Sequence, residues 1–191
     1  MNSQERAIAD LARLLSAAAI PYMLIGGHAN AIWGEPRATL DVDVTIWATE
    51  HQAEHVAAIL EPAFQCLVEQ PVNFVRDVRV LPFRSLDGVR IDVIFGLLPF
   101  EKIAIGRARR VSIAGCDVQV CSPEDLILMK VISERPRDLE DARGVVLARY
   151  EDLDFDYLDP QISELAEFLA KPEMARHWSQ WKHEAKDRRR A

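Results

Sequence analysis

Apolar residues near the start of the chain recur at helical spacing. Between residues 4 and 18 they fall on one stripe, which predicts a helix with one buried face. The stripe consists of Ile8, Leu11, Leu14, Leu15 and Ala18. Pro21 ends this helix, and residues 22–25 form a short apolar run typical of a buried strand.

Short apolar runs alternate with helical patterns along the rest of the chain, which predicts a mixed β-sheet flanked by helices, an α/β (α+β) fold. Further strands are expected at 41–46, 64–68, 78–83, 89–95, 111–113 and 116–121. Further helices are expected at 28–33, 50–60, 99–108, from Ser122 to Arg135, at 139–150, at 162–170 and after Pro172. The segments 34–40 and 69–76 are expected to be irregular.

The length of 191 residues predicts one main domain with a helical appendage. We place the main domain at 1–150 and the appendage, packed on it, at 151–191. Residues 151–159 carry five acids and no base, which is typical of a solvated linker. The basic end, Lys186 to Arg190, is expected to be disordered.

The composition is that of a globular protein, with 49% hydrophobic and 28% charged residues. The net charge of −7 provides no global field for nucleic acid, so any RNA contact must use a local patch. No apolar run is long enough to span a membrane, and the polar start is unlike a signal peptide, so we expect a cytoplasmic location. The three cysteines form no CxxC pair, which favours free thiols.

Asp41 and Asp43 lie one residue apart in a strand whose other face carries Val42, Val44 and Ile46. Because side chains alternate across a strand, both carboxylates project from one face. Their mutual repulsion is relieved by a cation, and Mg²⁺ prefers oxygen ligands. A lone Asp-x-Asp is also common at solvated strand edges, so this pair needs support from elsewhere in the chain.

Two further features supply that support. Gly26 and Gly27 end the first strand before a helix, where backbone N–H groups often bind phosphate. Asp92 lies between Ile91 and Val93 in another strand. Two adjacent carboxylates and a third from a neighbouring strand suit a two-metal phosphoryl or nucleotidyl transfer site. The alternative for Asp92 is a structural partner of Arg90 or Arg79.

Gly26-Gly27, Asp41-x-Asp43 and the isolated Asp92 together resemble the DNA polymerase beta-type nucleotidyltransferase superfamily. The longer strings GGHANAIWGEPRATLDVD and SPEDLILMKVISERPRDLEDARG resemble the AbiEii-like nucleotidyltransferases, many of them toxins of bacterial toxin–antitoxin pairs. The resemblance covers about residues 20 to 145. It implies a nucleotidyltransferase fold with a C-terminal helical segment.

The resemblance also implies roles for individual residues. Arg37 and Thr39 belong to the string G-x-x-R-x-T-x-D-x-D, in which the arginine either holds a phosphate or braces the carboxylates. Lys130, Arg135 and Asp138 match the pattern K-x-x-x-x-R-x-x-D, which implies that Lys130 contacts phosphate.

Other readings of these residues stay open. Lys130 has the alternative of an ammonium that reaches solvent, and Asp138 is also a good helix N-cap. Gly27 takes the place of the superfamily's usual serine, so a hydroxyl contact to the triphosphate is absent while the backbone contact survives.

Three other features have a functional and a structural interpretation. His28 either touches the nucleotide or packs and caps its helix. The basic cluster of Arg107, Arg109 and Arg110 is either an RNA contact or a solvated surface. Trp178 and Trp181 either pack on the body or form a partner interface.

The expected function is Mg²⁺-dependent transfer of an NMP from an NTP to a hydroxyl. Asp41 and Asp43 would hold two Mg²⁺ ions, and Asp92 would hold the second and take the hydroxyl proton. The resemblance implies an RNA acceptor such as a tRNA 3′ end, or a protein acceptor, and an antitoxin partner. The alternatives are a non-catalytic binding module or antitoxin of the same fold, and an antibiotic nucleotidyltransferase.

Overall fold

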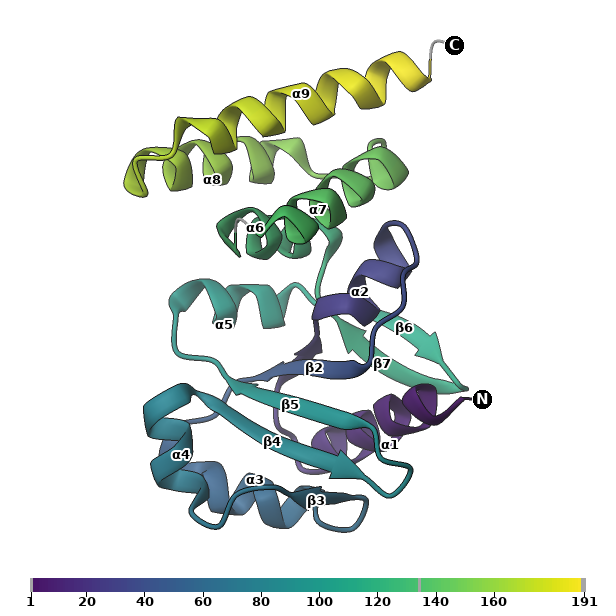
Figure 1. Cartoon of the computed structure of the whole chain (residues 1–191), viewed down its shortest axis with the longest axis vertical. Coiled ribbons are helices and arrows are strands. Elements are labelled where there is room, and N and C mark those ends of the chain that lie inside the picture. Colours follow the sequence, from purple (N-terminus) through teal and green to yellow (C-terminus); the bar gives the residue numbers. More distant parts are fainter. Residues whose placement is uncertain (1, 134, 190–191) are drawn as a thin grey trace. The chain divides into compact units, whose positions relative to one another are not determined.

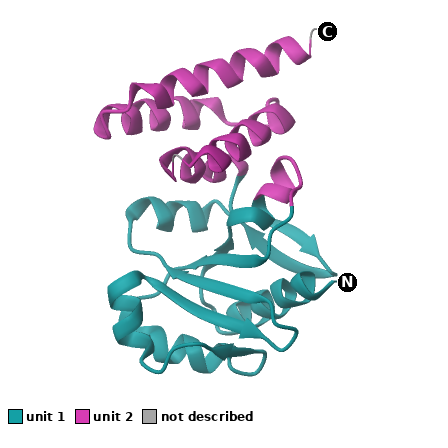
Figure 2. Cartoon of the chain, in the orientation of Figure 1, with its two compact units in different colours: residues 1–29, 38–122 teal, residues 30–37, 123–191 magenta. Residues whose placement is uncertain are grey.

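The computed structural model of the chain describes residues 2–133 and 135–189. The described residues form two compact units (Figure 2). Unit 1 comprises residues up to 29 and 38–122, and unit 2 comprises residues 30–37 and 123 onward. The expected division into a main domain at 1–150 and an appendage at 151–191 stays a prediction.

Unit 1 contains a seven-stranded mixed sheet with the strand order β3-β4-β5-β2-β1-β7-β6 (Figure 1). The strands are β1 (Tyr22–Leu24), β2 (Asp41–Ile46), β3 (Phe64–Cys66), β4 (Val80–Ser85), β5 (Arg90–Phe95), β6 (Arg109–Ile113) and β7 (Cys116–Val120). The parallel pairs are β2 with β5 and β1 with β7, and the other neighbours are antiparallel. This confirms the predicted mixed sheet.

Unit 1 contains helices as well as the sheet. They are α1 (Ser3–Ala17), α3 (Ala53–Leu60) with the short 3₁₀ turn η1 (Glu50–Gln52) before it, α4 (Pro71–Val78) and α5 (Pro99–Gly106). The helix α2 (Gly26–Trp33) follows β1. The predicted apolar stripe of α1 is confirmed, because Ile8, Leu11 and Leu15 are buried.

Unit 2 is helical, with α6 (Pro123–Ser133), α7 (Pro136–Arg149), α8 (Phe155–Phe168) and α9 (Pro172–Arg188). Its core includes Leu158, Ile162, Trp178 and Trp181, all buried. The tryptophans therefore pack among the helices of unit 2, and packing of residues 151–191 on a separate main domain stays a prediction. Across the described ranges, no helix combines the length and apolar composition that crossing a bilayer requires.

Three expectations for local structure are wrong. Residues 69–76 are not irregular, because α4 begins at Pro71, and proline suits the first helical position. Residues 151–159 are not a linker, because Asp154 caps α8 by accepting a hydrogen bond from the Tyr157 N–H at 3.0 Å. The basic end is helical through Arg188; Arg190 and Ala191 lie outside the described residues.

Candidate active site

Three carboxylates of unit 1 lie on one face of the sheet, those of Asp41, Asp43 and Asp92. In the parallel pair β2–β5, Asp43 is the register partner of Asp92, and Asp41 is the partner of Arg90. Paired residues on neighbouring strands are roughly 5 Å apart, so Asp43 and Asp92 lie side by side. Asp41 is exposed and the other two acids are half-buried, whereas Val42 and Ile91 on the opposite face are fully buried.

The Gly-Gly turn lies directly against these carboxylates. Gly26 has a φ of +66°, and a Cβ added to it would lie 2.1 Å from the Asp43 Oδ2 atom. A Cβ on Gly27 would lie 2.6 Å from the Thr39 Oγ1 atom. Gly26 therefore combines a left-handed backbone with a close approach to Asp43, and a side chain at Gly27 would have to displace the Thr39 side chain.

His28, in the first turn of α2, has a buried Nε2 atom with no hydrogen-bond partner among the described residues. Burial lowers the pKa of this imidazole, which favours its neutral form. A neutral ring nitrogen in the turn that begins at Gly26 is suited to contact a bound group rather than to carry charge. The choice between a nucleotide contact and simple packing stays a prediction.

Arg90 places a cation among the carboxylates. Its Nε atom donates to both oxygens of Asp92, at 3.1 and 3.2 Å, so the structural partner weighed for Asp92 is present. Within residues 2–133 and 135–189, no group of three or more His, Cys, Asp or Glu side chains is arranged to hold a metal ion. Asp43 and Asp92 nevertheless offer adjacent carboxylate oxygens, the ligand type that Mg²⁺ prefers. These carboxylate oxygens fit a hard cation if Asp92 releases Arg90 and binds the ion in its place.

The other predicted site residues belong to unit 2, where they form a charged cluster with a buried centre, Lys130 and Asp138, and an exposed edge at Arg135. Lys130 Nζ lies 2.5 Å from Asp138 Oδ1 and 2.8 Å from Asp141 Oδ2. Arg135 Nε donates to Asp138 Oδ2 at 2.5 Å. Lys130 and Asp141 are each 7% exposed and Asp138 is 3% exposed. The Lys130 ammonium therefore does not reach solvent, and its charge is matched by two acids.

Arg37 joins the same cluster. Its Nε and Nη2 atoms lie 2.9 Å from the two oxygens of Asp141, a bidentate pair. Asn30 donates from Nδ2 to Asp141 Oδ1 at 3.2 Å and to the carbonyl of Glu35 at 3.1 Å. These contacts tie residues 30–37 to α7, so the arginine braces Asp141. Whether it also holds phosphate or braces Asp41 and Asp43 stays a prediction.

The cluster keeps its acids ionised. Burial alone would raise the pKa of Asp138, but hydrogen bonds from Lys130, Ser133 and Arg135 outweigh burial and hold the pKa at about 2. Burial also opposes ionisation of Asp141, yet Arg37 and Lys130 lower its pKa. No sequence pattern marks Asp141 or Asn30 as members of this cluster, because Asp141 lies 104 positions from Arg37 and 111 positions from Asn30 along the chain.

A family model described as "Nucleotidyltransferase of unknown function (DUF6036)" matches residues 5–189. The chain belongs to this family. The match covers both units, so the nucleotidyltransferase assignment applies to the helices of unit 2 as well as to the sheet. No curated protein matches this DUF6036 chain.

Solved structures similar to this DUF6036 nucleotidyltransferase share its fold at low sequence identity. An antigenic nucleotidyltransferase-like protein from Paracoccidioides brasiliensis has a TM-score of 0.58 and 18% identity, covering 93% of each chain. The antibiotic-resistance factor ANT(2″)-Ia has a TM-score of 0.60 and 16% identity, covering 92% of this chain and 97% of its own. The lincosamide antibiotic adenylyltransferase LnuA has a TM-score of 0.51 and 12% identity, covering 76% and 96%. They establish the nucleotidyltransferase-like fold that the resemblance implied.

The structure thus brings the predicted site residues together in two groups. Gly26, Gly27, Thr39, Asp41, Asp43 and Asp92 lie in unit 1. Arg37, Lys130, Arg135 and Asp138 lie in unit 2. The first group combines carboxylates with a glycine turn, and the second is an ion-pair cluster built around the buried Lys130 and Asp138.

Proposed function

We propose that this protein is a metal-dependent nucleotidyltransferase that moves an NMP from an NTP to a hydroxyl acceptor. The observation that carries the proposal is the in-register pairing of Asp43 with Asp92 beside a glycine turn that touches Asp43. Membership of a nucleotidyltransferase family supports the same chemistry.

The proposed step is a displacement at the α-phosphorus of the NTP. The acceptor oxygen forms a bond to the α-phosphorus, the bond from that phosphorus to the β-phosphate oxygen breaks, and pyrophosphate leaves. Asp92 takes the hydroxyl proton and releases it to solvent. Backbone N–H groups of Gly26 and Gly27 bind the triphosphate at the start of α2. Asp41, Asp43 and Asp92 would hold Mg²⁺, which would stabilise the charge on the attacking and leaving oxygens.

The supporting residues have proposed roles of two kinds. Thr39 packs against Gly27 and positions the turn. Arg37, Arg135 and Asp138 hold Lys130 and the segment 30–37 in place through their ion pairs. A contact between Lys130 and the triphosphate is the part of the proposal that rests on the family resemblance alone.

The AbiEii-like resemblance favours RNA, such as a tRNA 3′ end, or a protein side chain as the acceptor. It also favours a role as a toxin, with an antitoxin as partner. Incubation with each α-³²P-labelled NTP, Mg²⁺ and tRNA or total protein tests this. We expect label on one acceptor class with wild-type protein and none with Asp43→Ala. Equal labelling by Asp43→Ala would contradict the proposal.

Transfer to an antibiotic is the second candidate. ANT(2″)-Ia, which has been solved with adenylyl-2″-tobramycin, and lincomycin-bound LnuA share this fold along most of their length. The same labelling reaction with tobramycin and with lincomycin in place of tRNA separates the two candidates. Label on the antibiotic and none on tRNA would indicate that the acceptor is an antibiotic rather than RNA.

A non-catalytic binding module or antitoxin is the remaining alternative, and the Arg90–Asp92 pair is the observation that favours it. An arginine that permanently occupies Asp92 would exclude a metal. If Arg90 instead yields to the ion, Arg90→Gln removes a competitor and Mn²⁺ binding tightens severalfold. Absent Mn²⁺ binding in both wild type and Arg90→Gln would favour the non-catalytic module.

A further inference from the structure

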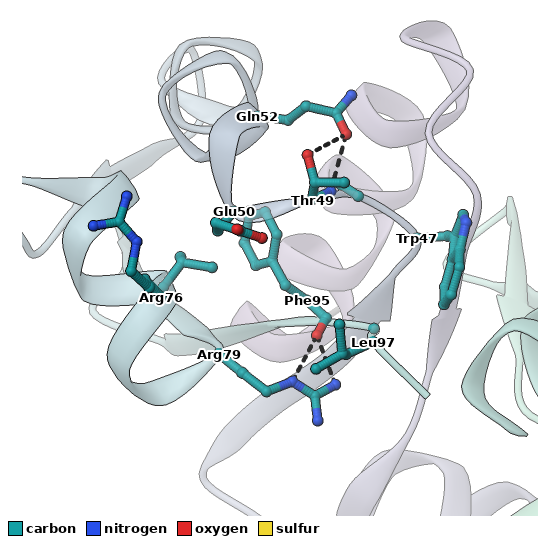
Figure 3. Close-up of a pocket in the computed structure, with 11 residues that line it drawn as sticks. Trp47, Thr49, Glu50, Gln52, Arg76, Arg79, Phe95 and Leu97 are labelled. Carbon is teal, nitrogen blue, oxygen red and sulfur yellow. Dashed lines mark hydrogen bonds between the residues drawn. The ribbon is translucent and has the colours of Figure 1, made fainter. Parts of the chain in front are cut away.

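A cavity of about 400 Å³ opens at the carboxyl ends of β2 and β5, within unit 1. Its walls come from the segment after β2, from α4 and its C-cap Arg79, and from the end of β5 and the residues after it (Figure 3). The paired carboxylates lie toward the amino-terminal ends of the same strands. Trp47 follows Asp43 by four residues, roughly 13 Å along a strand. The cavity is therefore distinct from the proposed transfer site.

The sheet topology explains why a crevice forms here. From β2 the chain passes through α3 to β3, and from the adjacent parallel strand β5 it passes through α5 to β6, in the opposite direction across the sheet. Both are parallel crossovers, and right-handed crossovers in opposite directions place their helices on opposite faces. The loops after β2 and β5 therefore diverge. Ligands of open α/β sheets commonly bind at such a switch point.

Apolar side chains form much of the cavity wall. Phe95 and Val75 are buried, Trp47 is half-buried and Leu97 is 66% exposed. The Lys102 ammonium lies 5.4 Å from the centre of the Trp47 ring. Figure 3 shows Trp47 and Arg76 on opposite sides of the cavity. A ligand with an apolar body would cover this wall.

Three charged side chains line the cavity, namely Glu50, Arg76 and Arg79. Of these three, only Arg79 has both a hydrogen bond and a close ion pair with described residues. Arg79 donates to the Phe95 carbonyl at 2.8 Å and pairs with Glu101 at 2.8 Å. Arg76 has no ion-pair or hydrogen-bond partner within residues 2–133 and 135–189. The Glu50 carboxylate lies 3.7 Å from the exposed His51 Nε2, and the same described ranges contain no ion pair between Glu50 and Arg76. One acid and one cation thus line the cavity without pairing with each other.

We propose that this cavity binds an α-amino acid with an apolar side chain. A purely anionic ligand would meet the Glu50 carboxylate, and a purely cationic ligand would meet Arg76. A zwitterion places its ammonium at Glu50 and its carboxylate at Arg76, while its side chain packs on Trp47, Val75 and Phe95. The volume is at the small end of ligand sites, which suits an amino acid better than a nucleotide. The site does not depend on the transfer chemistry proposed above.

Calorimetric titration with L-phenylalanine tests the site, with 3-phenylpropionate and phenethylamine as probes that each lack one charge. We expect L-phenylalanine to bind, and each single-charge probe to bind about tenfold or more weakly. Glu50→Gln should weaken the binding of L-phenylalanine by a similar factor, and it should not weaken the binding of 3-phenylpropionate. Arg76→Gln should weaken the binding of L-phenylalanine, and it should not weaken the binding of phenethylamine.

Arg84→Gln is the matched control, because Arg84 is an exposed arginine of the same unit that does not line the cavity. It should bind L-phenylalanine as the wild type does. Equal binding of all three probes, unchanged binding in both cavity variants, or no binding of L-phenylalanine to wild type would each overturn the proposal.

Discussion

Lys130 carries a positive charge in a helix position that is almost fully buried, and its neighbours account for that burial. Asp138 and Asp141 accept from its ammonium, and they in turn accept from Arg135 and from Arg37. A buried pair that loses one partner is strongly destabilised, because the remaining charge stays buried without compensation. These residues therefore contribute to the fold whatever contact they make with substrate.

The depressed pKa of Asp138 makes the stability of the protein depend on pH. A carboxyl whose pKa is about 2 in the folded protein and ~3.9 in the unfolded chain stabilises the fold above pH ~4, and that contribution is lost as pH falls toward 2. The difference in pKa corresponds to about 2.5 kcal/mol at neutral pH.

Urea unfolding of wild type and Asp138→Asn between pH 6 and pH 2 checks this expectation. We expect Asp138→Asn to be less stable by roughly 3 kcal/mol or more at neutral pH, because it also disturbs a buried pair. The gap between the two proteins should narrow as pH falls below ~4. A gap that is constant across this range would show that the Asp138 carboxyl does not titrate with folding.

At the residue scale, the sequence located the carboxylates and the glycines because their spacing carries the information. Asp41 and Asp43 share a face by strand alternation alone, and Asp92 stood out between apolar neighbours. Asn30 and Asp141 carried no such signal. Their bond joins residues 111 positions apart, and only the packing of residues 30–37 on α7 creates it.

The element that matters most for the proposed site is the turn between β1 and α2. Gly26 combines a positive φ with an approach to Asp43 that leaves no room for a Cβ. In Gly26→Ala, the left-handed backbone costs about 1–2 kcal/mol, and the new methyl group also displaces the Asp43 carboxylate. We expect at least a tenfold loss of Mg²⁺–NTP binding, measured by calorimetry.

Gly88→Ala is the matched control for backbone strain, because Gly88 has a φ of +82° and open space around its Cβ position. This variant should lose stability in a thermal melt and keep its nucleotide binding. If both alanine variants bound Mg²⁺–NTP equally well, the close approach of Gly26 to Asp43 would have no role in the site.

At the element scale, the sequence predicts most helices and strands, and two of the three wrong expectations for local structure share a cause. The sequence pattern predicts irregular chain at residues 69–76 and a solvated linker at residues 151–159. In the structure Pro71 begins α4, and Asp154 caps α8. The same residue types favour helix starts as well as loops, and the packing of the following residues decides between these outcomes.

The whole molecule depends on contacts between segments that are distant in sequence, and unit 2 shows this most clearly. Glu124 and Asp125 in α6 are fully buried. Glu124 accepts from the Asp154 N–H at 3.2 Å, and Asp125 accepts from the Tyr157 hydroxyl at 2.8 Å. A chain that ends at Tyr150 would lose both donors and the apolar cover of Leu158 and Trp178.

We therefore expect a fragment of residues 1–150 to lose the cooperative unfolding transition of the full chain, as measured by circular dichroism on heating. Phe168→Ala in the full chain is the control, because this side chain of α8 is 86% exposed and its removal should leave the transition unchanged. A fragment that unfolds as cooperatively as the full chain would establish 1–150 as an independent domain and 151–191 as a dispensable appendage.

The central claim is that the Asp41, Asp43 and Asp92 face binds a nucleotide through a divalent metal. Calorimetric titration of the protein with each NTP, with and without Mg²⁺, tests it most directly, repeated with the double variant Asp41→Asn/Asp43→Asn. The account predicts binding of at least one NTP that requires Mg²⁺ and is lost in the double variant. Binding that persists in the double variant, or the absence of Mg²⁺-dependent binding of any NTP, would contradict it.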